Sequence, residues 1–369
     1  MTWDAARELT VLLRPAGGGL YLVSSGLDAQ RRLQRRFYDA DSEADVTSRY
    51  LAELARVPSA EVVVLGIPSD VGAGFRRGAN LGPQAIRARL LDDDPAFHTR
   101  CAAEGVVDLG DVFVVPQLLH DDMLAPQQLA RSRVALYPDV PEAVRDTLPV
   151  SPLSIAERVL DLVFQLNPRA RPLVLGGDHS AAYPVVEALY RAGKRFCILQ
   201  FDAHTDLLRE RLGVRVCFAT WSYHANLRIG GAGRLIQAGV RASQHPREHW
   251  ESTQGVRQFW PEEYLGEEAR LVDDVVAAVR ATGLPVYISN DIDGTDAAFA
   301  DATGTPEPHG LSVDAVRNII ARVAQHVEIL AADVMEVAPL LGADGGRVTV
   351  GVAAEYVRAA LSALKARAA

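Results

Sequence analysis

The chain of 369 residues is long enough for one large domain or two ordinary ones. Hydrophobic residues make up 49% of it and charged residues 23%, as in an ordinary soluble globular protein. The formal net charge of −9, from 38 basic and 47 acidic side chains, argues against nucleic-acid or anionic-membrane partners, because both need a basic surface. Only three cysteines, and no apolar run of the roughly 18–20 residues that a membrane helix needs, predict a protein of the reducing cytoplasm.

Short apolar runs alternate with amphipathic segments along the chain, a pattern that predicts a parallel sheet covered by helices. Residues 1–58 are highly charged and helical in character, and we interpret them as an N-terminal extension ahead of one domain at 59–369. The predicted strands are nearly continuous apolar runs, as expected where both faces of a sheet are buried. These strands are Glu61–Ile67, Gly105–Leu109, Pro172–Leu175, Phe196–Phe201, Arg234–Val240, Pro285–Ser289 and Glu328–Ala332.

Four segments between or after these strands have the apolar spacing of helices. Ser154 begins an S-x-x-E capping box, which predicts that a helix starts there. Leu271–Ala281 and a segment capped by Ser312 bury apolar residues on one face, and Gly351–Ala369 ends in basic residues that suit a helix C-terminus. Residues 117–152 carry several prolines and no clear period, so we interpret them as a long excursion and a candidate lid.

Polar clusters follow three of the predicted strands, and ligands of an open parallel sheet collect outside the carboxyl ends of its strands. Asp202 and His204 are two residues apart, so on a continuing strand they would point the same way, and Asp206 can curl back to join them. Asp291 and Asp293 repeat this spacing after another strand. The candidate metal ligands are His179, Asp202, His204, Asp206, Asp291 and Asp293.

Four carboxylates and two imidazoles at one edge of a sheet indicate a cation site, because packing these anions together without a cation is costly. A single Asp-x-Asp after a strand is more often a turn or a helix cap, but three clusters that mix Asp with His favour metal. Six ligands are more than one ion takes from protein alone, and bridging carboxylates suit two ions roughly 3.5–4 Å apart. Ligation by oxygen and imidazole without thiolate favours Mn²⁺, with Ni²⁺, Co²⁺ or Fe²⁺ as alternatives.

These motifs resemble those of the ureohydrolase family, which comprises arginase, agmatinase and the guanidino-acid hydrolases. The similarity covers about residues 60–365 and includes segments outside the metal motifs. Those segments are residues 65–68, 72–79, 82–87, 237–241, 302–308 and 333–339. The resemblance implies a three-layer α/β/α sandwich with a mainly parallel sheet of about eight strands, which assembles into a homo-oligomer, either a trimer or a hexamer.

The family pattern also implies a ligand set and a reaction. One ion would bind His179, Asp202, Asp206 and Asp291. The other would bind Asp202, His204, Asp291 and Asp293, so that Asp202 and Asp291 bridge the pair. The two ions would share a water and turn it into a hydroxide that attacks the guanidinium carbon. Asp206 would carry the proton to the leaving amine, Glu336 would pair with the guanidinium nitrogens, and the products would be urea and an amine.

The chain departs from the family around its proton-relay histidine. Phe218 occupies that histidine's place, and His224 follows later in the chain, so His224 either supplies the imidazole or is purely structural. Trp221 lies in the same aromatic stretch, which can form one wall of the substrate pocket. Thr305 in the family's characteristic turn and His309 near the predicted mouth of the site are further candidate substrate contacts.

The substrate expected from these residues is a small guanidino compound other than arginine. Leu207 and Leu208 stand where arginase has a small polar residue that holds the amino-acid end of its substrate. Agmatine-, guanidino-acid- and guanidine-like substrates all remain open. Two alternatives also stay open: a formimino or amidine hydrolase, since such relatives often lack the histidine that Phe218 replaces, and a metal-bound homologue without turnover. Glu336 favours a guanidinium substrate over a formimino group, and the complete ligand set argues against a homologue without turnover.

Overall fold

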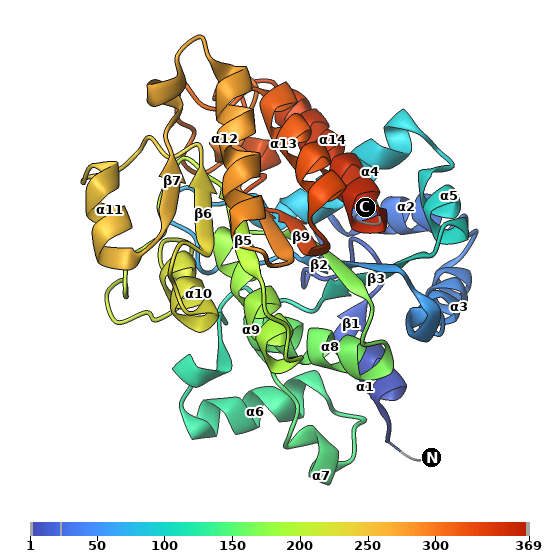
Figure 1. Ribbon diagram of the computed structural model, residues 1–369. Coiled ribbons are helices and arrows are strands. Elements are labelled where there is room, and N and C mark those ends of the chain that lie inside the picture. Colours follow the sequence, from blue (N-terminus) through green and yellow to red (C-terminus); the bar gives the residue numbers. More distant parts are fainter. Residues whose placement is uncertain (1–2, 23, 367–369) are drawn as a thin grey trace.

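A sheet of nine strands forms the centre of the computed structural model, which describes residues 3–22 and 24–366 (Figure 1). The strands are β1 (Leu13–Arg14), β2 (Val62–Ile67), β3 (Val106–Val112), β4 (Arg171–Gly176), β5 (Cys197–Phe201), β6 (Leu235–Ala238), β7 (Arg257–Phe259), β8 (Val286–Asn290) and β9 (Ile329–Val334). Their order across the sheet is β1-β3-β2-β4-β9-β8-β5-β6-β7, and every neighbouring pair is parallel except β1 with β3.

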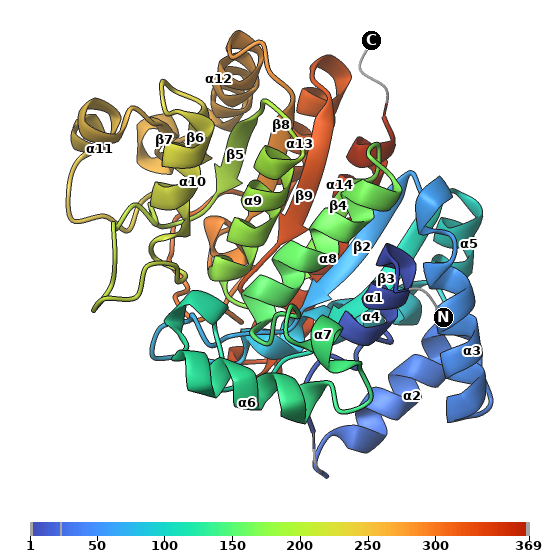
Figure 2. The same ribbon diagram turned by 90° about the horizontal axis from the view of Figure 1, so that it is seen from below.

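Helices cover both faces of the sheet, which confirms the predicted α/β/α sandwich (Figure 1, Figure 2). One layer contains α1 (Ala5–Leu12), α8 (Pro152–Leu166), α9 (Tyr183–Arg191) and α10 (Trp221–Ile229). The other contains α4 (Gly82–Asp93), α12 (Glu268–Ala281), α13 (Val313–His326) and α14 (Arg347–Lys365). The remaining helices are α2 (Leu27–Phe37), α3 (Glu43–Leu54), α5 (Phe97–Ala103), α6 (Pro126–Leu136), α7 (Glu142–Arg145) and α11 (Arg247–Gln254).

The apolar side chains form two cores, one on each face of the sheet. Along β2, Val63 and Leu65 belong to the core beneath α8 and α9, whereas Val62 and Val64 belong to the core beneath α13 and α14. Because neighbouring residues of such a strand are buried on opposite faces, the strand is apolar throughout. All seven predicted strands are present for this reason.

The sequence analysis missed β1 and β7, which have two and three residues and carry no apolar run long enough to predict a strand. The segment 1–58 contains the predicted helices, and it also contributes β1 to the sheet edge and the buried residues Leu9 and Leu12 to the core beneath α8. The boundary between extension and domain at residue 58 stays a prediction. In the part of the chain that the structure describes, none of the helices combines the length and apolar character that a membrane crossing requires.

The excursion 117–152 contains two helices that were not predicted, α6 and α7. Helix α6 has no buried residue, so no apolar period reveals it in the sequence, and the role of the excursion as a lid stays a prediction. The predicted start of a helix at Ser154 was wrong. Helix α8 begins at Pro152 rather than at Ser154, because proline is favoured in the first turn, and the hydroxyl of Ser154 instead accepts a hydrogen bond from Asp121 N at 3.0 Å. The cap at Ser312 is confirmed, since Ser312 Oγ accepts from Ala315 N at 3.0 Å.

An ion-pair network attaches the excursion to α8. His120 Nδ1 lies 2.6 Å from a carboxylate oxygen of Asp122, and His120 Nε2 lies 3.3 Å from Glu157 Oε1. Burial lowers the pKa of His120, but these two carboxylates outweigh it, so the pKa is raised above its ordinary value. The ring of His120 thus connects the excursion to the helix.

Four strands at the centre of the sheet, in the order β4-β9-β8-β5, end at the same edge. The polar motifs follow these strands directly, as residues 177–182 after β4, 335–339 after β9, 291–296 after β8 and 202–207 after β5. Segments far apart in the sequence therefore meet at one place, where the loops of a parallel sheet form a ligand site.

Candidate metal centre

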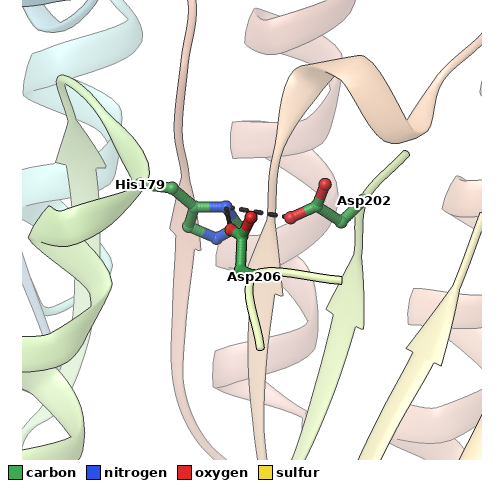
Figure 3. Close-up of side chains that lie close together, drawn as sticks. All are labelled: His179, Asp202 and Asp206. Carbon is green, nitrogen blue, oxygen red and sulfur yellow. Dashed lines mark ion pairs between the residues drawn. The ribbon is translucent and has the colours of Figure 1, made fainter. Parts of the chain in front are cut away.

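His179 lies at the centre of the first ligand group. It lies in a short 3₁₀ turn after β4, fully buried, and its Nδ1 is 3.1 Å from Asp202 Oδ2 and 3.4 Å from Asp206 Oδ2 (Figure 3). Asp291 Oδ2 lies 3.1 Å from the same nitrogen. The segments after two strands, β5 and β8, thus supply three carboxylates to one imidazole nitrogen from the segment after β4.

A second ligand group shares Asp202 with the first. His204 Nδ1 lies 3.1 Å from Asp293 Oδ2 and 3.5 Å from Asp202 Oδ1, so the two oxygens of Asp202 face different groups. His204 is 28% exposed whereas the aspartates are buried, so the site is open to solvent on its side. The structure thus brings all six predicted ligands together. Asp202 faces both groups, whereas Asp291 lies against His179 of the first group, and bridging by these two aspartates stays a prediction.

The donor atoms fit divalent cations. Within the described chain, His179 Nδ1 makes no hydrogen bond although it is buried and three carboxylate oxygens lie within 3.4 Å of it. Buried polar atoms in proteins are almost always satisfied, so this orphaned lone pair indicates a ligand. Oxygen and imidazole donors without thiolate suit Mn²⁺ and related ions.

The electrostatics of the cluster also favour cations. Burial lowers the pKa of His179, but Asp202, Asp206 and Asp291 raise it well above its ordinary value. The same balance raises the pKa of His204 to about 12, where Asp293 and Asp202 outweigh burial. Both imidazoles are held in a field that strongly stabilises positive charge.

A hydrogen-bonded pair behind His179 sets its orientation. His179 Nε2 lies 3.0 Å from Ser289 Oγ, which in turn donates to Asp333 Oδ1 at 3.2 Å. Asp333 also accepts from the hydroxyl of Tyr287 and from Asn290 N. With the proton on Nε2, the lone pair of Nδ1 points at the carboxylates, as metal ligation requires. Ser289 was not predicted, because no sequence pattern distinguishes a serine inside a strand that supports a ligand from one that does not.

A row of buried glutamines supports Asp202. Gln200 Nε2 donates to Asp202 Oδ2 at 2.7 Å, and Gln200 Oε1 accepts from Gln237 Nε2 at 2.9 Å and from Ser222 Oγ at 2.7 Å. Gln258 Nε2 donates to Gln237 at 2.8 Å, and the three glutamines are in register on β5, β6 and β7. The sequence analysis also missed these residues; the alternation of β5 was the available indication, since Gln200 and Asp202 share one face.

Glu336 follows β9 and lies against the first ligand group. Its Oε1 accepts a hydrogen bond from His179 N at 2.9 Å, and burial, together with Asp178, raises its pKa well above the ordinary value. Both Glu336 and Asp206 have left-handed backbones, with φ of 60° and 52°. Such conformations cost non-glycine residues roughly 1–2 kcal/mol and gather at functional sites.

The other predicted site residues lie in different surroundings. Trp221 is fully buried beside His179 and donates from Nε1 to Asp206 Oδ2 at 3.0 Å. Thr305 Oγ1 donates to Asp293 Oδ2 at 3.0 Å, so it positions a candidate ligand. His309 is exposed, with a φ of 61°, and substrate contact for all three residues stays a prediction.

His224 is held by the backbone. Its Nε2 lies 3.0 Å from the carbonyl oxygen of Arg209, and its ring packs edge-on against Tyr223 and Tyr183. Burial lowers its pKa below the ordinary value. These contacts favour the structural alternative, and the relay role stays a prediction.

The fold and the site together define a metalloenzyme centre of the two-cation type, in which carboxylates and imidazoles meet at the carboxyl ends of parallel strands. The comparison with known families gives the same result. The chain belongs to the arginase family, whose model matches residues 60–362. This match confirms the resemblance on which the ligand assignment was based.

Individual relatives are similar over most of the chain. A guanidinobutyrase from Pseudomonas aeruginosa is 29% identical over 306 residues, which cover 80% of this chain and 85% of the relative. A mitochondrial agmatinase from Gallus gallus is 30% identical over 357 residues, covering 92% and 94%. Among solved structures, the proclavaminate amidino hydrolase from Streptomyces clavuligerus has a TM-score of 0.62 and 28% identity, covering 84% of this chain and 92% of that one.

Proposed function

We propose that this protein is an amidinohydrolase that cleaves a small guanidino compound other than arginine into urea and an amine at two divalent cations. The observation that carries the proposal is the pair of ligand groups joined by Asp202, with the orphaned Nδ1 of His179 facing three carboxylates. The relatives named guanidinobutyrase and agmatinase support a guanidino substrate.

The chain's own residues determine which ions fit. One cation would be held by His179, Asp202, Asp206 and Asp291, and the other by Asp202, His204, Asp291 and Asp293. When bound, such a pair supplies a water activated as a nucleophile near neutral pH. We propose Mn²⁺ as the physiological ion with Ni²⁺ as the alternative, because the donor set suits both.

Two carboxylates are assigned to the substrate and its proton. Asp206, whose orientation is set by the hydrogen bond from Trp221, accepts a proton and delivers it to the leaving amine. Glu336 pairs with the guanidinium nitrogens, because a carboxylate matches the fork geometry of two parallel N–H groups. Its bond from His179 N aligns it with the ligand group.

We propose that arginine is not the substrate, and its α-amino group is the reason. This cationic group needs a hydrogen-bond acceptor or an acidic partner, and the two residues after Asp206 are both leucines. Leu207 is buried in the core and Leu208 is exposed, so neither offers a hydrogen bond from its side chain.

Urea release tests the proposal. The protein is loaded with Mn²⁺ or Ni²⁺ and assayed with agmatine, guanidino acids, guanidine, arginine and a formimino compound. Urea from a guanidino compound, but not from arginine, is the expected result. Cleavage of the formimino compound without urea from any guanidino compound would instead establish a formimino or amidine hydrolase. Metal binding without any turnover would establish a metal-bound homologue without activity.

Three further assignments belong to this proposal. We propose a homo-oligomer, trimeric or hexameric, and a cytoplasmic location, and we propose that residues 1–58 form an extension of the catalytic domain at 59–369. Light scattering of the purified protein, fractionation of cells and a truncation at residue 58 test the three. A monomer would contradict the oligomer, and a membrane-bound or secreted protein would contradict the cytoplasmic location. A truncated chain that fails to fold would contradict the assignment of residues 1–58 as an extension.

A further inference from the structure

A cavity of about 440 Å³ lies among loops that follow the strands β2 and β5. It is formed by the loop after β2, the first part of the excursion 117–152 and the loop after β5. Its apolar lining consists of Val71, Leu119, Met123, Leu124, Val214 and Phe218. Among the described residues that line it, Arg211 is the one charged side chain.

Hydrogen bonds link the cavity lining to the segment that carries the ligand His179. Phe218 N donates to Gly72 O at 3.1 Å, and Gly72 N donates to Asp178 Oδ2 at 3.0 Å, directly before His179. Burial raises the pKa of the Cys217 thiol in the cavity lining, and Asp178 and Asp206 raise it further. Residues that line the cavity are thus close to carboxylates of the candidate metal centre.

Arg211 is presented to the cavity by a tight turn. Its backbone N–H and carbonyl form two hydrogen bonds with Val214, of 3.0 and 2.9 Å, and the turn residues Leu212 and Gly213 have φ of 51° and 80°. Two successive residues at positive φ define the narrow hairpin turn that strand ends favour. The position of Arg211 is therefore set by the backbone.

Phe218 holds the side chain of Arg211. The guanidinium carbon lies 5.3 Å from the centre of the Phe218 ring, within the range of a cation–π interaction. The ring also lies close to Gly74, where an added Cβ would come within 3.4 Å of it. A histidine at position 218 would bring a second cationic group against Arg211 when protonated, so the change to phenylalanine is compatible with this arrangement.

The charge of Arg211 is available for a ligand. Within the described chain it forms no ion pair, whereas Asp122, near the same cavity, is paired with Arg215 and His120. The carboxylate of Asp121 accepts from Ser151 N at 2.8 Å. The carboxylates of Asp121 and Asp122 are thus engaged with partners other than Arg211.

Resting on the proposed function, we propose that the substrate is a guanidino acid whose tail carboxylate binds Arg211, with its methylene chain in the apolar cavity. A tail ammonium, as in agmatine, would meet a like charge there with no acidic side chain in the lining to offset it. The metal centre thus binds the cationic end of the substrate, and Arg211 selects its anionic end.

Three probes with the same tetramethylene chain test this proposal: 5-guanidinopentanoate, agmatine and butylguanidine, whose tails are anionic, cationic and neutral. The variants are Arg211→Gln and Arg211→Glu, with Arg209→Gln as the matched control, since Arg209 is an exposed arginine of the same loop that does not line the cavity. kcat/KM is measured by urea release, and the affinity of each probe by calorimetry on the metal-loaded protein.

The wild type is expected to prefer 5-guanidinopentanoate, and Arg211→Gln to lower its kcat/KM and affinity for that probe by about 10- to 100-fold, the range for a hydrogen bond to a charged group. Butylguanidine values should not change, Arg211→Glu should favour agmatine, and Arg209→Gln should resemble wild type. A wild type that prefers agmatine would overturn the proposal. An Arg211→Gln variant that discriminates between 5-guanidinopentanoate and agmatine as the wild type does would also overturn it. In both cases urea release would still uphold the proposed function. Arg211-dependent binding of the acid without urea from any probe would support the subsite and contradict the proposed function.

Discussion

Replacing Ser289 with alanine tests whether His179 ligates metal through Nδ1. Ser289 Oγ accepts from His179 Nε2 at 3.0 Å and donates to Asp333 Oδ1 at 3.2 Å, so the substitution removes the group that sets both the tautomer and the angle of the ring. The substitution removes a single oxygen atom from a fully buried position and leaves all six ligands in place. Its effect on metal binding therefore acts through His179 alone.

The expected magnitude follows from the lost hydrogen bond. Leaving a buried N–H unsatisfied costs about 1–3 kcal/mol. A metal-free ring can rotate to recover part of that cost, whereas a ligating ring must keep Nδ1 aimed at the cation, so most of the penalty falls on the metal-bound state. We therefore expect metal affinity to fall by about 10- to 100-fold, the range seen when such a supporting partner is removed.

Competition with a chromophoric chelator measures this change, and urea release at saturating metal measures kcat. Ser289→Ala should bind Mn²⁺ more weakly and recover most of its kcat once metal is saturating. Ser151→Ala is the matched control, because Ser151 is also fully buried and its hydroxyl makes no hydrogen bond within the described chain. A folded Ser289→Ala protein with wild-type metal affinity would refute the assignment of Nδ1 as a ligand supported from behind.

Four further predictions follow from the site and the fold. Asp202→Asn and Asp291→Asn should each abolish activity and remove most bound metal, because both would bridge the two ions; two ions per chain in either variant, by elemental analysis, would disprove bridging. Glu336→Gln should raise KM for a cationic guanidino substrate and leave metal content intact, and unchanged kinetics would remove Glu336 from the substrate site. His224→Asn should lower the melting temperature and keep most of kcat, whereas a fall of about 10²–10⁴-fold would establish the relay. His120→Asn should lower the free energy of unfolding most below about pH 6.5, and its effect should shrink as pH rises through the raised pKa of His120 in the folded state. The reason is that His120 stabilises the fold only while its ring is charged. Denaturant titrations that show the same difference between variant and wild type across this pH range would contradict the prediction.

The metal centre could be predicted from the sequence because its ligands obey the geometry of a parallel sheet. Asp202 and Asp291 directly follow buried strands, and the apolar runs that form those strands are easily read. Ser289 could not be predicted, since it is a polar residue inside β8 and its partners His179 and Asp333 belong to the turn after β4 and to β9. The pairing of strands brings these residues together, and no local pattern records that pairing. Gln200 had one local indication, because it shares a face of β5 with Asp202, but its contact with Gln237 depends on the pairing of β5 with β6.

The parts of the fold that escaped prediction lack an apolar period for a physical reason. Helix α6 buries none of its residues in this chain. Strand β1 has only two residues, Leu13 and Arg14, which pair with β3. The sequence at Ser154 matches a capping box, but the helix starts earlier in the chain. Pro152 occupies the first turn and Ser151 occupies the cap position. Local patterns compete, and tertiary contacts decide between them.

The two ends of the proposed substrate are bound by parts of the fold that respond differently to mutation. The cation ligands lie at the ends of central strands, whose positions are set by two buried cores, so a change there disturbs folding and chemistry together. Arg211 and Phe218 lie on the loop after β5, and the turn that carries Arg211 is exposed. A change at Arg211 can therefore alter the charge selected at the substrate's tail without moving a metal ligand. On this proposal, a site held by rigid strands and a tail contact carried by a loop can change independently, as functional loops on a rigid scaffold do.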